Sequence, residues 1–163
     1  MRLYLVQHGD AVPKDVDPDR PLSDKGRADI RRLVEWLSSH DVRVAQILHS
    51  GKGRAIETAE LLRPLLISPG HIYEAHGLAP NDSPEAFLHQ LKDPKRDTLV
   101  AGHMPFVARM LSQALTGAPD RQLVEFLPGS VAGIERCEGS SWHLFLFSRP
   151  ESLQRTGISQ AIF

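Results

Sequence analysis

Apolar residues along the chain occur in two patterns, short continuous runs and runs at helical spacing. Residues 3–6 form an apolar run that is followed at once by the polar turn 7–10, which predicts a buried strand ending in a glycine-containing turn. Ser23 then stands as a helix N-cap before apolar residues at helical spacing between 30 and 37. The N-terminal part of the chain therefore predicts a strand followed by a helix.

Strand-like and helix-like segments continue to alternate through the middle of the chain. Further strands are predicted at residues 44–49, 71–74 and 98–101. Helices are predicted to begin after Gly51, at Ser83 and Pro84, and at Pro105. Beyond Gly117, short strands are predicted at 124–126, 131–135 and 143–147, and the stretch from Arg149 is either a short helix or a loose tail.

This order of elements predicts the α/β class. Short connections between alternating strands and helices favour right-handed crossovers, which give a mostly parallel central sheet with helices on both faces, a three-layer sandwich. At 163 residues the chain has the length of one domain. Open sheets of this kind bind ligands outside the carboxyl ends of their strands, so the functional residues are expected there.

Composition removes several classes of function. The net charge of -1 gives no general attraction for nucleic acid. No apolar run approaches the roughly 20 residues of a membrane span, so no membrane partner is expected. A single cysteine, Cys137, excludes an intrachain disulfide and suits a cytoplasmic protein. The 8 histidines stand out beside 2 tyrosines, and histidine is the side chain that acts as base, nucleophile or ligand near neutral pH.

Two of these histidines and one arginine stand at expected strand ends. The first strand leads into His8, the second into Ser50 with Arg54 about one helical turn further, and the fourth into His103. Because parallel strands present their carboxyl ends at one edge, these side chains are expected to converge. Arg54 lies in the first turn of its helix, where free N–H groups and the helix dipole attract an anion. Gly9 is expected to let such an anion approach His8 closely.

Known site patterns narrow the chemistry further. Residues 51–53 do not complete a phosphate-binding P-loop, because Gln46 stands where the first glycine of that motif is required. His71 and His76 are the only histidines three to five positions apart, and no third ligand stands near them, so no metal is expected. A histidine nucleophile beside an arginine suits phosphoryl transfer, in which positioning and electrostatic stabilisation carry catalysis.

Four motifs, in order and spacing, resemble the histidine phosphatase superfamily. They are Val6-Gln7-His8-Gly9-Asp10-Ala11, Arg20-Pro21-Leu22-Ser23 with Gly26, Ser50 and Arg54-Ala55 with Thr58-Ala59, and Gly102-His103-Met104-Pro105. The short chain, the Asp10 after the glycine and the His-x-Pro motif are most similar to the SixA-like phosphohistidine phosphatases of that family. The resemblance implies a histidine phosphatase or phosphoglycerate mutase-like fold that needs no metal or organic cofactor.

The resemblance also implies roles for the residues at the strand ends. His8 would be the nucleophile that takes the phosphoryl group, and Arg54 and His103 would bind and polarise it, with a protonated His103 as a second donor. Arg20 would reach the phosphate from a loop at the pocket mouth. Residues 1–163 would form a single domain without a lid insertion, open enough for a histidine-phosphorylated phosphorelay or phosphocarrier protein as substrate.

Two positions depart from the family pattern or leave it incomplete. Gln7 stands where the family has an arginine, so its amide offers donors to the phosphate but no charge. That difference is expected to cost about 1–2 kcal/mol, or about tenfold in rate. Asp82 is the nearest candidate general acid after the third strand, with a turn or cap role as the alternative. A weak or absent acid would favour phosphohistidine, because imidazole leaves more readily than an alkoxide.

Two other functions stay open. A small-molecule phosphomonoesterase or phosphoglycerate-mutase-like transferase would need a lid and a firm general acid. A weakly active or non-catalytic phosphate-binding module would follow if Gln7 marks a decayed site, although the presence of His8, Arg54 and His103 argues against full decay.

Overall fold

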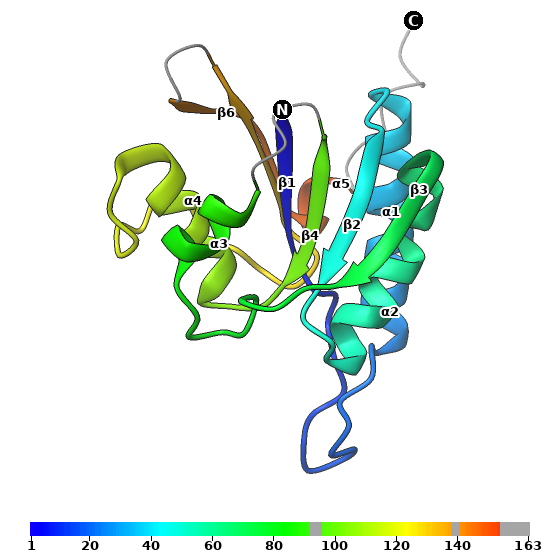
Figure 1. The fold of residues 1–163 in the computed structure, drawn as a ribbon. Helices are drawn as coiled ribbons and strands as arrows, with labels where there is room; N and C mark the ends of the chain where they lie inside the picture. The colour runs from blue at the N-terminus through cyan, green and yellow to red at the C-terminus, as the bar shows by residue number, and fades with distance from the viewer. Residues whose placement is uncertain (92–95, 138–140, 154–163) are drawn as a thin grey trace, which may run out of the picture.

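The computed structural model describes residues 1–91, 96–137 and 141–153. The strands are β1 (Arg2–Gln7), β2 (Val44–His49), β3 (Leu66–Glu74), β4 (Thr98–Gly102), β5 (Val131–Arg136) and β6 (Trp142–Ser148). The helices are α1 (Asp24–Ser39), α2 (Gly53–Leu61), α3 (Pro84–Gln90), α4 (Phe106–Thr116) and α5 (Pro150–Leu153), with a 3-10 helix, η1 (Arg63–Leu65), after α2. Figure 1 shows their arrangement.

The strands form one six-stranded mixed sheet in the order β3-β2-β4-β1-β5-β6. The pairs β3–β2, β2–β4 and β4–β1 are parallel, as the alternation of strands and helices predicts. The last two strands, β5 and β6, join by antiparallel pairing. They follow one another without a crossover helix, which is the connection that antiparallel strands allow.

Helices cover both faces of the sheet, with α1 and α2 on one side and α3 and α4 on the other (Figure 1). Alternate residues of β1 divide between the two layers. Tyr4 and Val6 pack into a core with α1 and α2, and Leu3 and Leu5 pack into a second core with α3 and α4. All four side chains are almost fully buried, because a central strand with helices on both faces has no solvent side. The three-layer α/β fold is confirmed.

Two expected elements differ from the structure. The third strand starts at Leu66, five residues before the predicted His71. The strand expected at 124–126 is wrong, because this segment is a loop. Its one well-buried side chain, Phe126, packs edge-on against Phe147, and the neighbouring edge of β1 is already paired with β5. The apolar residues at 124–126 were therefore predicted as a strand, although they belong to a loop that buries one aromatic ring.

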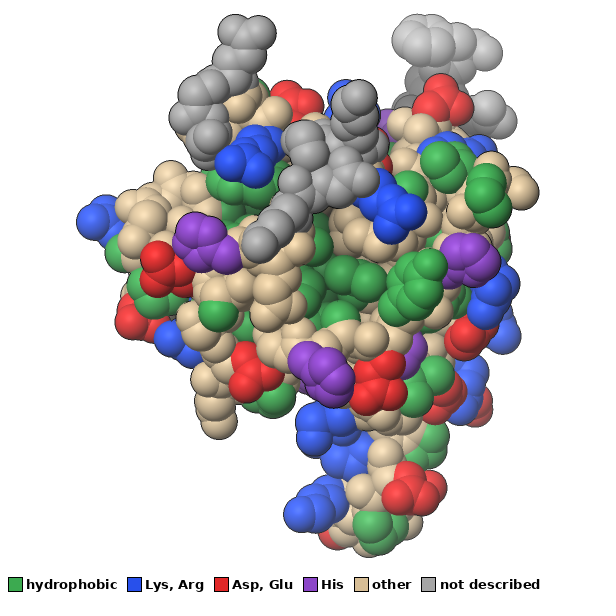
Figure 2. Space-filling model, viewed as in Figure 1, with side chains coloured by type: hydrophobic (Ala, Val, Ile, Leu, Met, Phe, Trp, Pro, Cys, Tyr) green, Lys and Arg blue, Asp and Glu red, His purple; other side chains and the backbone are tan. Residues whose placement is uncertain are grey.

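The C-terminal stretch from Arg149 begins with the short helix α5, and residues 154–163 of the predicted tail lie outside the described residues. In the described ranges, no helix has the length and apolar character needed to cross a membrane. The carboxyl ends of β1, β2 and β4 meet at the lower end of the molecule in Figure 1. Figure 2 shows Lys and Arg side chains gathered at this lower end.

Candidate active site

The ends of β1 and β4 bring His8 and His103 together. Gln7, the last residue of β1, is paired with Gly102, the last residue of β4. The His8 backbone N–H donates to the Gly102 carbonyl at 2.9 Å, which extends the pairing by one residue. The two imidazole rings consequently lie with their centroids 5.0 Å apart.

The hydrogen bonds of His8 determine which ring nitrogen carries its proton. Nδ1 lies 2.7 Å from the Gly9 carbonyl, which can only accept, so Nδ1 is the protonated nitrogen. Nε2 accepts a hydrogen bond from Nε of Arg54 at 3.1 Å and is therefore unprotonated. The Nε2 lone pair, the one a nucleophile needs, thus points at the arginine that is expected to hold the phosphoryl group.

Burial keeps both histidines neutral near pH 7. It is the main cause that lowers the pKa of His8, and the charges of Arg54 and Arg20 lower that pKa further. Burial, followed by the charges of His8, Arg54 and Lys52, lowers the pKa of His103 to about 3. With the protein's own groups alone, His103 is therefore neutral, so its role as a second donor requires that a ligand raise its pKa. A bound phosphate would favour its protonation, because an adjacent negative charge stabilises the imidazolium.

His103 is held by Ser50 on the turn between β2 and α2. The Ser50 Oγ and the His103 Nε2 are 2.5 Å apart and share a hydrogen bond. The His103 side chain is buried, and its Nδ1 has no hydrogen-bond partner in the described part of the chain. Ser50 therefore fixes the ring so that Nε2 faces the β2–α2 turn.

The first turn of α2 adds positive charge and a free helix end. Arg54 is the second residue of α2, whose N-cap, Lys52, makes no side-chain capping bond, and the first turn contains no acidic residue. The Arg54 terminal nitrogens have no hydrogen-bond partner among residues 1–91, 96–137 and 141–153. Both features leave donors available for an anion at this helix end.

Arg20 approaches the same place from the loop between β1 and α1. Its charge lowers the pKa of both His8 and Arg54, so its guanidinium lies near them. The backbone at Arg20 has a φ of 50°, in the left-handed region, and Nε donates to the Val12 carbonyl at 3.3 Å. The structure therefore places Arg20 near His8 and Arg54.

Close packing against α1 explains the glycine that follows His8. A Cβ on Gly9 would lie 3.0 Å from both the Gly26 carbonyl oxygen and Ile30 Cγ1. Gly26 in turn has no space for a Cβ beside the Asp10 backbone. The approach of the loop to α1 thus already requires a glycine at position 9, and the expectation that Gly9 also makes room for a phosphoryl group stays a prediction.

Thr58 of α2 anchors the same loop. The Gly9 backbone N–H donates to Thr58 Oγ1 at 3.1 Å, and this hydroxyl donates to the Arg54 carbonyl at 2.8 Å. Thr58 is fully buried. One side chain therefore links the residue after His8 to the backbone of Arg54, and it sets the position of both groups relative to each other.

Gln7 lies buried beside this site, with 8% of its surface exposed. Its backbone is fixed by bonds to Ser130 and Gly129, whose N–H donates to the Gln7 carbonyl at 3.0 Å. The side-chain Oε1 is buried and has no hydrogen-bond partner in the described ranges. A buried polar atom without a partner is costly, so Gln7 and His103 Nδ1 are the two unsatisfied groups at the sheet edge.

Of the three carboxylates near the strand ends, two are engaged elsewhere. Asp82 accepts from the Ala79 N–H at 2.7 Å and closes a turn, which is the alternative role given above and argues against a general acid. Asp10 accepts from Ser23 Oγ at 2.6 Å and so holds the start of α1. Glu74 lies against the β2–α2 turn, where a Cβ on Gly51 would be 2.5 Å from its Oε1.

Three residues of the site were missed in the sequence as contributors. Ser50 was noted as a strand end and a motif residue, Thr58 only as part of a motif, and Lys52 only within a rejected P-loop pattern. The available signal was the place of Ser50 and Lys52 between the second strand and α2, and that of Thr58 four residues after Arg54 on the same helix. No group of His, Cys, Asp and Glu side chains in the described residues could hold a metal ion.

Comparisons with known proteins agree with this architecture. The model of the histidine phosphatase superfamily (branch 1) matches residues 3–72. Phosphohistidine phosphatase SixA of Escherichia coli is 27% identical over 122 residues, which cover 72% of this chain and 76% of the relative.

Solved structures share the fold at lower sequence identity. The protein histidine phosphatase SixA complexed with tungstate gives a TM-score of 0.80 at 23% identity, covering 94% of this chain and 99% of that chain. The α-ribazole phosphatase of Shigella flexneri gives a TM-score of 0.74 at 16% identity, covering 92% of this chain and 97% of that chain. The solved structures show the shared fold. The matched family model and the SixA relative show that the chain belongs to the histidine phosphatase superfamily.

Proposed function

We propose that the protein is a phosphohistidine phosphatase, with His8 as the nucleophile that carries the phosphoryl group. The unprotonated Nε2 of His8, directed at Arg54 across 3.1 Å, is the observation that carries this proposal. In the first step Nε2 forms a bond to phosphorus while the bond from phosphorus to the substrate imidazole breaks. The leaving imidazole takes a proton from solvent. Water then attacks the phosphoryl group on His8, loses a proton to solvent, and releases phosphate.

The positive groups around His8 support a site for a phosphoryl group. Arg54 offers two terminal N–H donors in the fixed geometry that matches phosphate oxygens. Arg20 and Lys52 add charge at the opening, since each lowers the pKa of a neighbouring site residue. When a phosphoryl group takes the Arg54 donors, the Nε2 lone pair of His8 is released for attack. Binding and activation of the nucleophile are thereby coupled in one residue.

The occupied carboxylates favour phosphohistidine over an ester. Asp82 is used in a turn and Asp10 at the α1 cap, so neither is placed to protonate an alkoxide. An imidazole leaves from phosphorus as a group that solvent protonates readily, so it needs no positioned acid. A histidine-phosphorylated protein, in a phosphorelay or as a phosphocarrier, is therefore the proposed substrate, as in the name of the SixA relative.

A small-molecule phosphomonoesterase is the second candidate. Glu74 favours it, because its carboxylate lies beside Gly51, next to Ser50 of the site. The α-ribazole phosphatase with the same fold is a phosphatase of this other kind. If Glu74 donates a proton to an ester oxygen, Glu74→Gln lowers turnover of an alkyl phosphate and leaves turnover of phosphohistidine unchanged.

One experiment separates these functions. The protein is incubated with a histidine-phosphorylated carrier protein, a sugar-acid monophosphate and an aryl phosphate, each labelled on phosphorus, and is quenched rapidly to trap a phosphoenzyme. We expect an acid-labile label from the carrier protein that His8→Ala abolishes and that the exposed-site control His89→Ala retains. A label from the small phosphates alone would establish the second candidate. Tight phosphate binding without any label would establish a non-catalytic binding module.

A further inference from the structure

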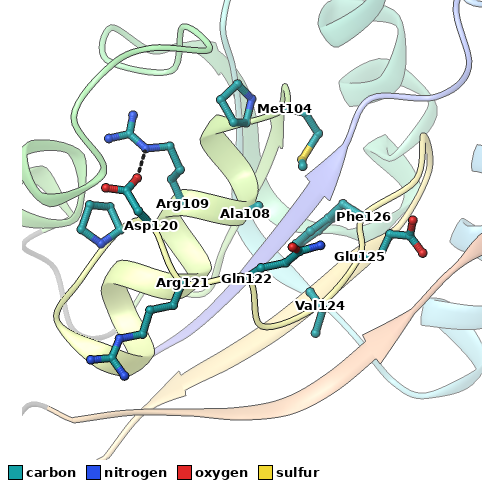
Figure 3. Close-up of a pocket in the computed structure, with 11 residues that line it drawn as sticks. Met104, Ala108, Arg109, Asp120, Arg121, Gln122, Val124, Glu125 and Phe126 are labelled. Atoms are coloured by element: carbon teal, nitrogen blue, oxygen red, sulfur yellow. Dashed lines mark hydrogen bonds and ion pairs between the residues drawn. The ribbon is translucent and has the colours of Figure 1, made fainter.

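A groove of about 440 Å³ begins one residue after His103. Its floor is apolar and comes from the start of α4 and from the loop before β5: Met104, Pro105, Ala108, Val124 and Phe126. We call this hollow the Met104 groove. Figure 3 shows Met104, Ala108, Val124 and Phe126 facing it.

The Met104 groove has charged residues of both signs at its margin. Arg109 and Asp120 form an ion pair of 3.2 Å on one side, and Glu125 lies on the other (Figure 3). Glu125 is paired with Arg149 at 3.0 Å. An apolar floor containing Met and Phe inside a charged margin containing Arg has the composition of a protein–protein interface.

The position of the groove decides which part of a ligand enters it. Met104 follows His103 directly, and consecutive Cα atoms are about 3.8 Å apart, so one wall of the groove starts at the residue next to the second histidine. Met104 is 38% exposed, although its side chain is large and apolar. An apolar group beside the phosphoryl group would cover the exposed part of Met104.

From this arrangement we infer that the Met104 groove binds an apolar side chain next to the phosphohistidine of a substrate protein. The inference rests on the proposed function and adds its substrate preference: the protein selects phosphohistidines that have a leucine-like neighbour. The phosphoryl group is held by Arg54 and the histidines, and the neighbouring side chain fills the groove. The preference acts on substrate binding, because the groove touches no reacting atom.

The test measures turnover of two phosphohistidine peptides and of phosphoramidate, which has the phosphorus–nitrogen bond but no neighbouring residue. One peptide has leucines on both sides of the phosphohistidine, and the other has serines there. We expect kcat/KM for the leucine peptide to exceed that for the serine peptide by about fivefold or more, mostly through KM. Ala108→Glu, which places a charge on the floor of the groove, is expected to remove this preference without changing turnover of phosphoramidate.

Two further variants keep the test independent of folding. Val124→Glu places the same charge on the floor from a loop and should act like Ala108→Glu. Ala86→Glu makes the identical change at an exposed position of α3, outside the groove, and should retain the full preference. A variant that loses phosphoramidate turnover as well has lost its fold or its phosphate site and is replaced by the other groove variant.

The outcomes distinguish failure of the groove inference from failure of the proposed function. Equal turnover of both peptides by the unchanged protein, with phosphoramidate cleaved, overturns the groove inference and leaves the proposed function standing. No turnover of either peptide or of phosphoramidate overturns the proposed function itself. A third outcome is that Ala108→Glu slows cleavage of 1-naphthyl phosphate and leaves cleavage of both peptides unchanged. That result would show that the groove binds an apolar small molecule, and it would exclude a substrate protein as its occupant.

Discussion

Nε of Arg54 donates a hydrogen bond to Nε2 of His8 across 3.1 Å. This bond joins the first turn of α2 to the residue after β1, and it fixes the neutral form of His8 in which Nε2 carries the lone pair. The same lone pair cannot accept this N–H and attack phosphorus at once. A bound phosphoryl group must therefore take over Arg54 before His8 reacts.

Replacement of Arg54 by lysine should separate charge from geometry. Arg54→Lys keeps a positive charge but loses both the Nε donor to His8 and the paired donors for phosphate oxygens. We expect the rate of phosphoenzyme formation to fall about 100-fold, the range seen when one positioned donor is removed from a transition state. Rapid-quench measurement of labelled protein gives this rate. Arg63→Lys, at an exposed position paired with Glu60, is the matched control. A rate for Arg54→Lys within about threefold of the unchanged protein would show that charge alone suffices.

Thr58 should act on the reaction without touching the substrate. Thr58→Val keeps the shape of the side chain but leaves the buried Gly9 N–H without its acceptor, which costs about 1–3 kcal/mol of stability. We expect kcat to fall while KM for phosphoramidate changes little, because the loop carrying His8 is displaced relative to Arg54. Thr58→Ser retains the hydroxyl and should restore kcat. Equal loss in both variants would mean that the hydroxyl by itself does not account for the effect on kcat.

Strand ends were the part of the site that the sequence revealed well. His8 and His103 each follow a short apolar run. Parallel pairing of β1 with β4 places the ends of the two strands side by side, so the convergence of these histidines follows from topology alone. The contacts of Ser50 and Thr58 could not be predicted, because each joins residues about 50 positions apart through a single hydroxyl. The protonation state of His103 could not be predicted from the sequence either, since its pKa depends on burial that only the folded chain creates.

The low pKa of His103 should make stability depend on pH. Its pKa is about 3 in the folded chain, against 6.5 for the ordinary side chain. Between these values the unfolded chain binds the additional proton, so the free energy of unfolding rises with pH and the contribution of neutral His103 is lost as pH falls. We expect His103→Gln to reduce the slope by up to about 1.4 kcal/mol per pH unit within this window. Urea unfolding between about pH 4 and pH 7 measures it.

Two comparisons sharpen that measurement. His8 also has a lowered pKa, so some of the slope should remain in His103→Gln and fall further in the double variant with His8→Gln. His89→Gln replaces an exposed histidine and should leave the slope unchanged. Inorganic phosphate should stabilise the folded protein more at the acidic end of the range, because it favours protonated His103. An identical slope with and without His103 would mean that folding does not lower the pKa of this ring.

Gln7 offers a direct test of the charge that its position lacks. Gln7→Arg would place a guanidinium at the end of β1, beside Gly102 and the two histidines. If the missing charge slows the reaction, the variant should turn over phosphoramidate about tenfold faster, since a charged donor adds about 1–2 kcal/mol to the binding of the transition state. Gln7→Met, with similar size and no polar atoms, should be slower than the unchanged protein if the amide donates to the phosphoryl group.

Because Gln7 is buried, the Gln7→Met variant also tests the effect of this side chain on stability. Its Oε1 has no partner in the described chain, so Gln7→Met also removes an unsatisfied polar atom and should raise the melting temperature. Loss of activity together with a gain in stability would mean that the carboxamide is kept for the reaction at a cost to the fold. A Gln7→Arg protein that melts normally but is no faster than the unchanged protein would show that Arg54, Arg20 and Lys52 already supply all the charge the phosphoryl group requires.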